Sequence, residues 1–135
     1  MSLKIAIVGN SKINIGIAMA GDLTLAGHDV HFYIFPEEND TRIEIEKFGG
    51  ILLDEPTDQT ICKMKGLANP ILENTIESAV KDAEIIVLDL PPLEIEEKFS
   101  YIILYLHDDQ IVHFNTHGYW SVLRVMEQPR KSGKS

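Results

Sequence analysis

Two glycines, Gly9 and Gly16, bound the part of the sequence best suited to binding a ligand. They enclose the turn Asn10-Ser11-Lys12-Ile13-Asn14-Ile15, between an apolar run and a helical pattern. Unpaired N–H groups at a helix N-terminus bind phosphate, and glycine lets a ligand approach the backbone closely. The fingerprint G-x-G-x-x-G is not intact, because six residues separate these glycines in place of four and the middle glycine is missing. The turn is therefore a phosphate loop helped by the side chains of Ser11 and Lys12, a turn with only a structural role, or an enlarged turn that blocks a dinucleotide.

A second determinant of dinucleotide binding is an acidic residue at the end of the second strand, which binds the adenine-ribose hydroxyls. In this sequence that place falls on Ile34, which cannot accept a hydrogen bond. Glu37 lies just beyond it, and Arg42 is near enough to face a 2′-phosphate. The residues leave NAD and NADP both open, and Glu37 also fits an exposed loop charge.

Polar residues and prolines follow two later strands, at the edge where open α/β sheets bind ligands. Asp89 lies near the end of an apolar strand, just before Leu90-Pro91-Pro92, and could line the ligand crevice. We expect Asn115 and His117 near the nicotinamide end of a bound cofactor, although His117 also suits a plain polar turn. We expect no metal site, because His113 and His117 have no obvious third ligand.

The composition limits the class of protein. The chain has 135 residues, of which 44% are apolar, enough for one domain and too few for two. Its net charge of −9 repels nucleic acid and anionic membranes. The single cysteine, Cys62, cannot form an internal disulfide, which is typical of a reducing compartment. With no apolar run near the ~18 residues of a membrane span and no signal-peptide layout, the sequence predicts a cytoplasmic protein.

Strand and helix patterns alternate along the chain. Short apolar runs bounded by turn residues predict strands over 4–8, 29–35, 84–90 and 110–115, with a hairpin formed by 51–54 and 60–65. Helical spacing predicts helices over 16–26, 41–48, 73–81, 93–106 and 119–127, with a core stripe from Leu93 to Leu106. Asn14 is a plausible N-cap, and Gly27 a stop, for the first helix.

This alternation predicts an α/β fold, a Rossmann-type open and mainly parallel sheet with helices on both faces. We expect residues 1–128 to form one dinucleotide-binding domain. Residues 129–135 suit a linker or a disordered end.

The run from Lys4 to Tyr33, KIAIVGN…NIGIAMAGDLTLAGHDVHFY, resembles the opening of the opine dehydrogenases, the octopine and nopaline dehydrogenase group. These are similar in turn to ketopantoate reductases. The segments Ala18-Met19-Ala20 and Ala26-Gly27-His28-Asp29-Val30 match the family's first helix and the step into its second strand. Leu90-Pro91-Pro92 sits where the family has its V-P-A loop, and the likeness covers residues 4–125. The departures are the two-residue insertion in the phosphate loop and Ile34 in place of the acid.

The resemblance implies the nucleotide-binding domain of an NAD(P)-dependent dehydrogenase that transfers hydride to an imine or a 2-keto acid. In that family a second, helical domain carries the catalytic His and Asp. Nothing in this sequence corresponds to that domain, so no catalytic residue is carried over and whether the chain alone is an enzyme stays open. The expected partners are a dinucleotide and either a separate catalytic domain or a second copy bound through the predicted C-terminal helix.

Two other readings stay open. The chain could be a non-catalytic module that senses a nucleotide or binds a protein through Tyr119-Trp120. It could also be a small α/β domain of the flavodoxin or receiver type. Receiver domains need clustered acids at strand ends, and here the first strand ends without one.

Overall fold

The structure is a computed structural model that describes residues 2–9, 15–53 and 66–115. Its helices and strands follow one another as β1 (Lys4–Gly9), α1 (Ile15–Leu25), β2 (Asp29–Ile34), α2 (Asn39–Phe48), β3 (Ile51–Leu53), β4 (Gly66–Ala68), β5 (Ile71–Leu72), α3 (Ile76–Val80), β6 (Ile85–Asp89), α4 (Ile95–Ile102) and β7 (Ile111–Phe114). Short 3-10 turns lie at Pro36–Glu38, Pro92–Glu94 and Ile103–Tyr105. Within these ranges, no helix is both long enough and apolar enough to cross a lipid bilayer.

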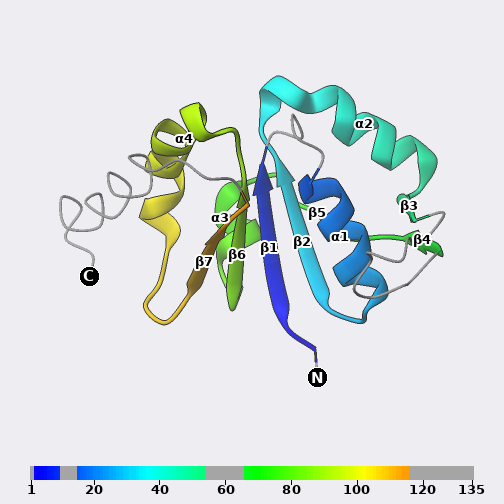
Figure 1. The fold of residues 1–135 in the computed structure, drawn as a ribbon, viewed down its shortest axis with the longest axis horizontal. Helices are drawn as coiled ribbons and strands as arrows, with labels where there is room; N and C mark the ends of the chain where they lie inside the picture. Colours follow the sequence, from blue (N-terminus) through cyan, green and yellow to red (C-terminus); the bar gives the residue numbers. More distant parts are fainter. Residues whose placement is uncertain (1, 10–14, 54–65, 116–135) are drawn as a thin grey trace.

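Five of the strands form one parallel sheet in the order β5-β2-β1-β6-β7 (Figure 1). The chain moves outward from β1 through β2 to β5, and then in the other direction through β6 to β7. The strand order therefore reverses between β1 and β6, the point at which open α/β sheets bind their ligands. The predicted Rossmann-type fold is confirmed.

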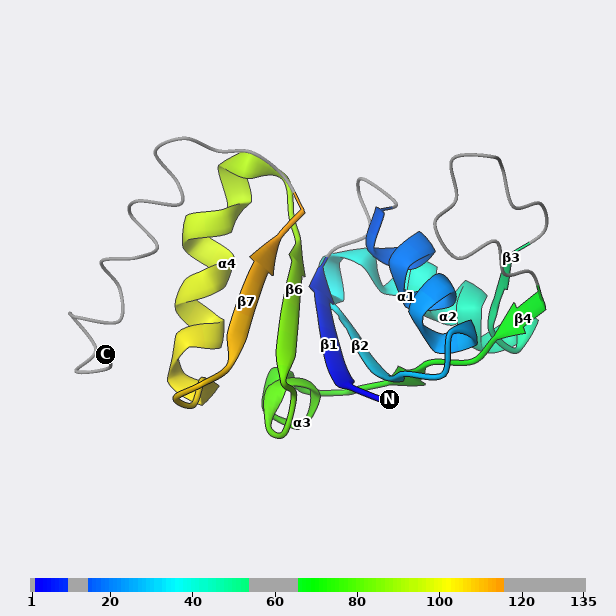
Figure 2. The same ribbon diagram turned by 60° about the horizontal axis from the view of Figure 1, so that its bottom comes forward.

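Helices cover both faces of this sheet (Figures 1 and 2). Successive side chains of a strand point to opposite faces. Ile7 of β1 packs in the cluster that holds Ala20 of α1, whereas Val8 packs in the cluster that holds Phe99 of α4. The apolar run of β1 is thus buried on both faces, which is why the sequence shows no alternation there.

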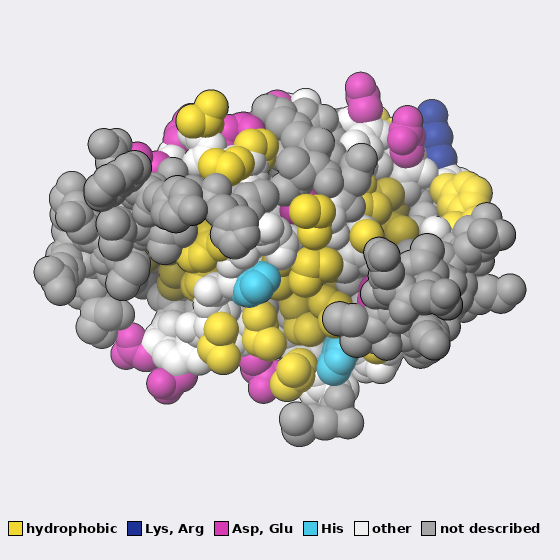
Figure 3. Space-filling view, viewed as in Figure 1, with side chains coloured by type: hydrophobic (Ala, Val, Ile, Leu, Met, Phe, Trp, Pro, Cys, Tyr) yellow, Lys and Arg dark blue, Asp and Glu magenta, His cyan; other side chains and the backbone are white. Residues whose placement is uncertain are grey.

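One part of the α1 side of the sheet stays exposed. On β7, Val112 and Phe114 pack against the core under α4, while Ile111, which faces the other way, is 61% exposed. In the space-filling view, hydrophobic side chains run down the middle of this face (Figure 3). Helix α1 lies over β1 and β2, and no helix within the described ranges covers β7 from that side.

Glycines end two of the helices as the sequence predicts. Gly27 follows α1 with a φ of 96°, and Gly49 follows α2 with a φ of 88°. Both values lie in the left-handed region, which glycine enters without the steric cost that a Cβ imposes. These stops set the points at which the chain turns back toward the next strand.

The first strand of the predicted hairpin pairs with a segment that follows the predicted return strand. β3 and β4 are antiparallel and pair Ile51 with Ala68, so the return strand is Gly66–Ala68. The predicted return over 60–65 lies outside the described residues. Gly50 explains the tight pairing, because a Cβ there would lie 2.3 Å from the carbonyl oxygen of Ala68.

Two predicted helices are shorter than their patterns suggested. The helix expected over 73–81 begins only after Thr75, whose hydroxyl oxygen accepts a hydrogen bond from the Ser78 N–H as an N-cap. The residues before it form β5, a strand too short for a sequence pattern to reveal. The helix expected over 93–106 is α4 flanked by two 3-10 turns, and Leu93 is 97% exposed rather than a member of the core stripe. The prolines before it hold the chain in a turn that points Leu93 outward.

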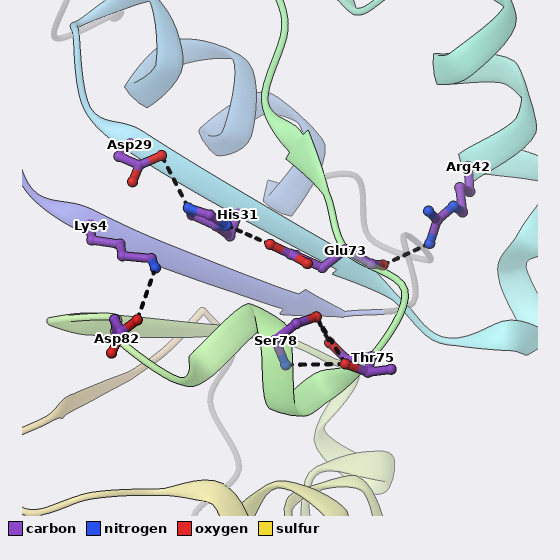
Figure 4. Close-up of polar contacts among 8 residues, drawn as sticks. All are labelled: Lys4, Asp29, His31, Arg42, Glu73, Thr75, Ser78 and Asp82. Carbon is purple, nitrogen blue, oxygen red and sulfur yellow. Dashed lines mark hydrogen bonds and ion pairs between the residues drawn. The ribbon is translucent and has the colours of Figure 1, made fainter.

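A polar cluster fastens β5 to the edge of the sheet (Figure 4). The nearly buried His31 of β2 has its Nδ1 2.6 Å from Glu73 Oε1, just after β5. Its Nε2 lies 3.0 Å from Asp29 Oδ1, at ion-pair distance but without hydrogen-bond geometry. Arg42 of α2 donates to the Glu73 carbonyl oxygen and to Asn74. The cluster therefore joins β2, the end of β5 and α2.

The Glu73 carboxylate makes part of this stability depend on pH. Burial opposes its ionisation, but hydrogen bonds from His31 and Ser78 outweigh burial and hold the pKa of Glu73 below its ordinary value of 4.5. A lowered folded-state pKa contributes stability above the unfolded pKa, and this contribution is lost as the pH falls through the folded pKa. We expect Glu73→Gln to lower the free energy of unfolding at pH 7 by about 1.5 kcal/mol. Between pH 5 and pH 3, the free energy of unfolding should fall less in this variant than in the wild type.

The measurement is the free energy of urea unfolding at pH 7, 5, 4 and 3, followed by circular dichroism. Glu44→Gln, on the exposed side of the middle of α2, is the matched control and should follow the wild type. Parallel pH profiles for Glu73→Gln and the wild type would show that this carboxylate does not carry the effect.

Candidate functional site

The candidate site lies at the carboxyl edge of the sheet, where β1 and β6 end side by side. Gly9 is the last residue of β1 and is in register with Asp89, the last residue of β6. A Cβ on Gly9 would lie 2.5 Å from the carbonyl oxygen of Asp89, closer than real Cβ contacts come. Only glycine at this position lets the two strands end in contact at the switch point.

The first turn of α1 packs onto the same place. Helix α1 begins at Ile15, and a Cβ on Gly16 would lie 2.4 Å from Asp89 Oδ2 and 2.8 Å from Asp89 Cβ. The missing side chain lets the helix N-terminus, with its unpaired N–H groups, come down directly over the strand ends. We call this close packing of Gly9 and Gly16 against Asp89 at the start of α1 the cradle. It places a helix N-terminus at the switch point, so these residues fit a dinucleotide whose phosphates meet the start of α1.

A buried carboxylate lies at the centre of the cradle. Asp89 is 1% exposed, and its Oδ1 accepts a hydrogen bond of 3.3 Å from Asn115 Nδ2. The Asn115 N–H donates to the carbonyl oxygen of Leu88, which holds the asparagine at the end of β7. The sequence placed Asp89 at this edge, but only the structure shows that its carboxylate packs beneath the first turn of α1.

Apolar residues form the rim on the β6 side. Leu90 is buried in the core, Pro91 and Pro92 are half-buried, and Leu93 projects almost fully into solvent. Sequence reasoning assigned Leu93 to the core and so missed it as a residue of this edge. The available signal was the Pro91-Pro92 pair, which is typical of a turn or a first helical turn and not of a helix interior.

The two residues expected near the adenosine ribose have other partners. Ile34 ends β2 and is buried on the α1 side, so it leaves no acceptor at the usual acid position. Glu37 forms an ion pair with Lys98 of α4. Arg42 binds Glu46 as well as the Glu73 carbonyl oxygen and Asn74. A ribose contact by Glu37 or Arg42 would compete with these bonds.

Glu37 and Lys98 belong to a groove of about 570 Å³ on the α3–α4 side of the sheet. Burial opposes protonation of Lys98, yet the hydrogen bond to Glu37 raises the pKa of the ammonium group. Burial and the nearby Glu37 carboxylate raise the pKa of Tyr33 in the groove. Lys98 also lies 4.6 Å from the centroid of the Phe35 ring. The Glu37 side chain is therefore engaged in this groove.

The structure thus brings Gly9, Gly16, Leu90 and Asn115 together around Asp89. Five further predicted site residues, Asn10, Ser11, Lys12, Asn14 and His117, lie outside the described residues. Within the described ranges, no group of three or more His, Cys, Asp or Glu side chains is placed to hold a metal ion.

Solved structures with the same fold include reductases and dehydrogenases. An octopine dehydrogenase in complex with NADH and L-arginine matches 84% of this chain with a TM-score of 0.66 and 16% identity. An Enterococcus faecalis protein described as a 2-dehydropantoate 2-reductase matches 93% with a TM-score of 0.65 and 17% identity. An imine reductase variant from Myxococcus stipitatus, in complex with NAD+, matches 100% with a TM-score of 0.61 and 14% identity.

At these identities the likeness establishes the fold. The expected similarity to opine dehydrogenases and ketopantoate reductases is confirmed at that level. No protein-family model and no curated protein matches the sequence. The chain spans only 28% of the octopine dehydrogenase, 37% of the reductase from Enterococcus faecalis and 39% of the imine reductase.

Proposed function

We propose that this chain is the dinucleotide-binding domain of an NAD(P)-dependent dehydrogenase of the opine type. The observation that carries the proposal is the cradle at the switch point, where Gly9 and Gly16 leave no room for a Cβ beneath the start of α1. The solved structures of the same fold include complexes with NADH and NAD+, which supports this assignment. The hydride acceptor would be an imine or a 2-keto acid.

The residues of this chain would bind and orient the cofactor, and the cofactor would supply the hydride chemistry. Gly9, Gly16 and the N–H groups of the first turn of α1 would hold the pyrophosphate. The loop residues Asn10, Ser11, Lys12, Asn14 and Ile15 would add contacts. Glu37 or Arg42 would meet the adenosine ribose, and the choice between them decides NAD or NADP. The nicotinamide half would lie against four residues: Leu90, Pro91, Pro92 and Asn115, with His117 nearby.

The catalytic residues would come from a second domain or a separate chain, because this chain spans only 28%, 37% and 39% of the three similar solved structures. We place the domain at residues 1–128 and a linker at 129–135. A second copy bound through residues 119–127 is the other partner that the sequence suggests.

Calorimetric titration of the purified chain with NADH and NADPH, run separately, tests the proposal. We expect one of them to bind with micromolar affinity, because the cradle at Gly9 and Gly16 is already formed without ligand. ADP-ribose should compete, since it carries the pyrophosphate and the adenosine half. Absence of binding by both dinucleotides at millimolar concentration would contradict the proposal and favour a non-catalytic interaction module.

A further inference from the structure

The buried Asp89 carboxylate is an unusual group to find in a phosphate cradle. It lies under the first turn of α1. The positive end of the helix dipole there interacts with the Asp89 carboxylate as well as with a bound phosphate. Its Oδ2 would lie 2.4 Å from a Cβ on Gly16, so the carboxylate packs directly against the start of α1, where the phosphates of the proposed dinucleotide would bind. The carboxylate therefore acts on the charge of whatever binds there.

The topology tells which half of a dinucleotide this carboxylate meets, given the proposed function. The adenosine ribose binds at the end of the second strand, here β2. The nicotinamide half then lies on the other side of the switch point, over β6 and β7. Asp89 ends β6, and its partner Asn115 follows β7. Asp89 is thus on the nicotinamide side of the pyrophosphate.

The oxidised and reduced cofactors differ in charge only at the nicotinamide ring. The ring of the oxidised form carries one positive charge, and the ring of the reduced form is neutral. A fixed carboxylate attracts the first and leaves the second unaffected, while its repulsion of the pyrophosphate is common to both. Because Asp89 is buried, solvent ions screen this interaction much less than they screen surface pairs.

We propose that Asp89 makes this site selective for the oxidised dinucleotide, through the attraction of its buried carboxylate for the cationic nicotinamide ring. This inference rests on the proposed function. Tighter binding of the oxidised form lowers the reduction potential of the bound couple. The domain therefore favours reduction of the substrate over its oxidation.

The expected size follows from Coulomb's law. At an effective dielectric constant of about 20, two unit charges about 4 Å apart interact by about 4 kcal/mol, and by less at longer range. A tenfold effect on a dissociation constant, about 1.4 kcal/mol, lies within that range. The ratio of the dissociation constants, reduced over oxidised, should therefore fall about tenfold when the Asp89 charge is removed. Both forms should also bind more tightly to the neutral variant, because the repulsion of the pyrophosphate is removed.

The experiment is titration of the wild type and three variants with NAD+ and NADH, and with NADP+ and NADPH if the phosphorylated couple binds. Asp89→Asn keeps the shape and can still accept the hydrogen bond from Asn115. Asp89→Ser removes the charge with a smaller side chain, and so remains informative if the amide disturbs folding. Asp108→Asn is the matched control and should leave the ratio unchanged. Asp108 is exposed and precedes the amino end of β7, whereas the site lies at the carboxyl ends of the strands.

An unchanged ratio in folded Asp89→Asn and Asp89→Ser, with binding intact, would overturn the inference and leave the proposed function standing. A wild type that binds the reduced form more tightly than the oxidised form would overturn the inference too. If neither the wild type nor the neutral variants bind any dinucleotide, the proposed function itself fails.

Discussion

Gly9→Ala is expected to lower the free energy of unfolding by about 3 kcal/mol, the upper end of the range for overpacked cores. The new methyl would lie 2.5 Å from the carbonyl oxygen of Asp89 and 2.9 Å from its Cβ. The first of these is a backbone atom in the central part of the sheet, so it cannot swing away as a side chain would. The measurement is urea unfolding followed by circular dichroism at pH 7.

Gly49→Ala separates this clash from the general cost of replacing a glycine. Gly49 has a φ of 88° with no atom within 4 Å of the added Cβ, so only its left-handed backbone opposes alanine. That conformation costs about 1 kcal/mol for an L-residue. If Gly9→Ala loses no more stability than Gly49→Ala, the strand ends have more freedom than their packing suggests.

Gly16→Val is expected to weaken dinucleotide binding at least about a hundredfold, equivalent to about 2.7 kcal/mol. The first carbon of the new side chain would lie 2.4 Å from Asp89 Oδ2 and 2.7 Å from Asp89 Cγ. The start of α1 must then lift away from the strand ends, and its N–H groups leave the position where they would meet the pyrophosphate. The affinity for NADH or NADPH, whichever the wild type binds, is the quantity to compare.

Ala18→Val is the matched control because it adds a valine to the exposed side of the same helix. It should cost only a few tenths of a kcal/mol in helix propensity, about 0.5 at most, and leave binding unchanged. Gly16→Ala should be measured beside Gly16→Val, since one methyl disturbs the fold less. Folded Gly16→Val that binds as tightly as Ala18→Val would place the phosphates elsewhere.

The sequence predicted the central part of the fold because the buried strands there have a recognisable pattern of apolar residues. β1 and β6 are buried on both faces, so each appears as an unbroken apolar run. Gly27 and Gly49 ended the helices where the chain enters the left-handed region. Parallel pairing then followed from the alternation of strands and helices.

The periphery could not be predicted in the same way. β5 has two residues, so no periodic pattern can distinguish it from a loop. The position of this strand depends on the contact between His31 and Glu73, which are far apart in the sequence. Leu93 looked like a core residue by spacing alone. Its exposure follows from the turn at Pro92–Glu94, where a helical count from Ile95 no longer applies.

The candidate site was predicted in part. Gly9, Gly16 and the strand ends carried local signals, and the structure brings them together. Glu37 and Arg42 each have a partner on another element, Lys98 on α4 and Asn74 before α3, and no local pattern predicts these two contacts. The depth of burial of Asp89 depends on α1 packing above it, and that is a property of the tertiary structure alone.

Because Gly16 and Asp89 are in direct contact, a substitution tolerated at one position depends on the residue present at the other. With a methyl at position 16, α1 can keep its seat on the strand ends only if position 89 has already lost its side chain, because the Cβ of Asp89 is itself 2.8 Å from the added carbon. Substitutions at residues in contact are not additive, so the order in which they arise matters. In a library randomised at both positions, the folded members should pair a small residue at one with a larger residue at the other. Redesign of this loop therefore has to treat the two positions as one variable.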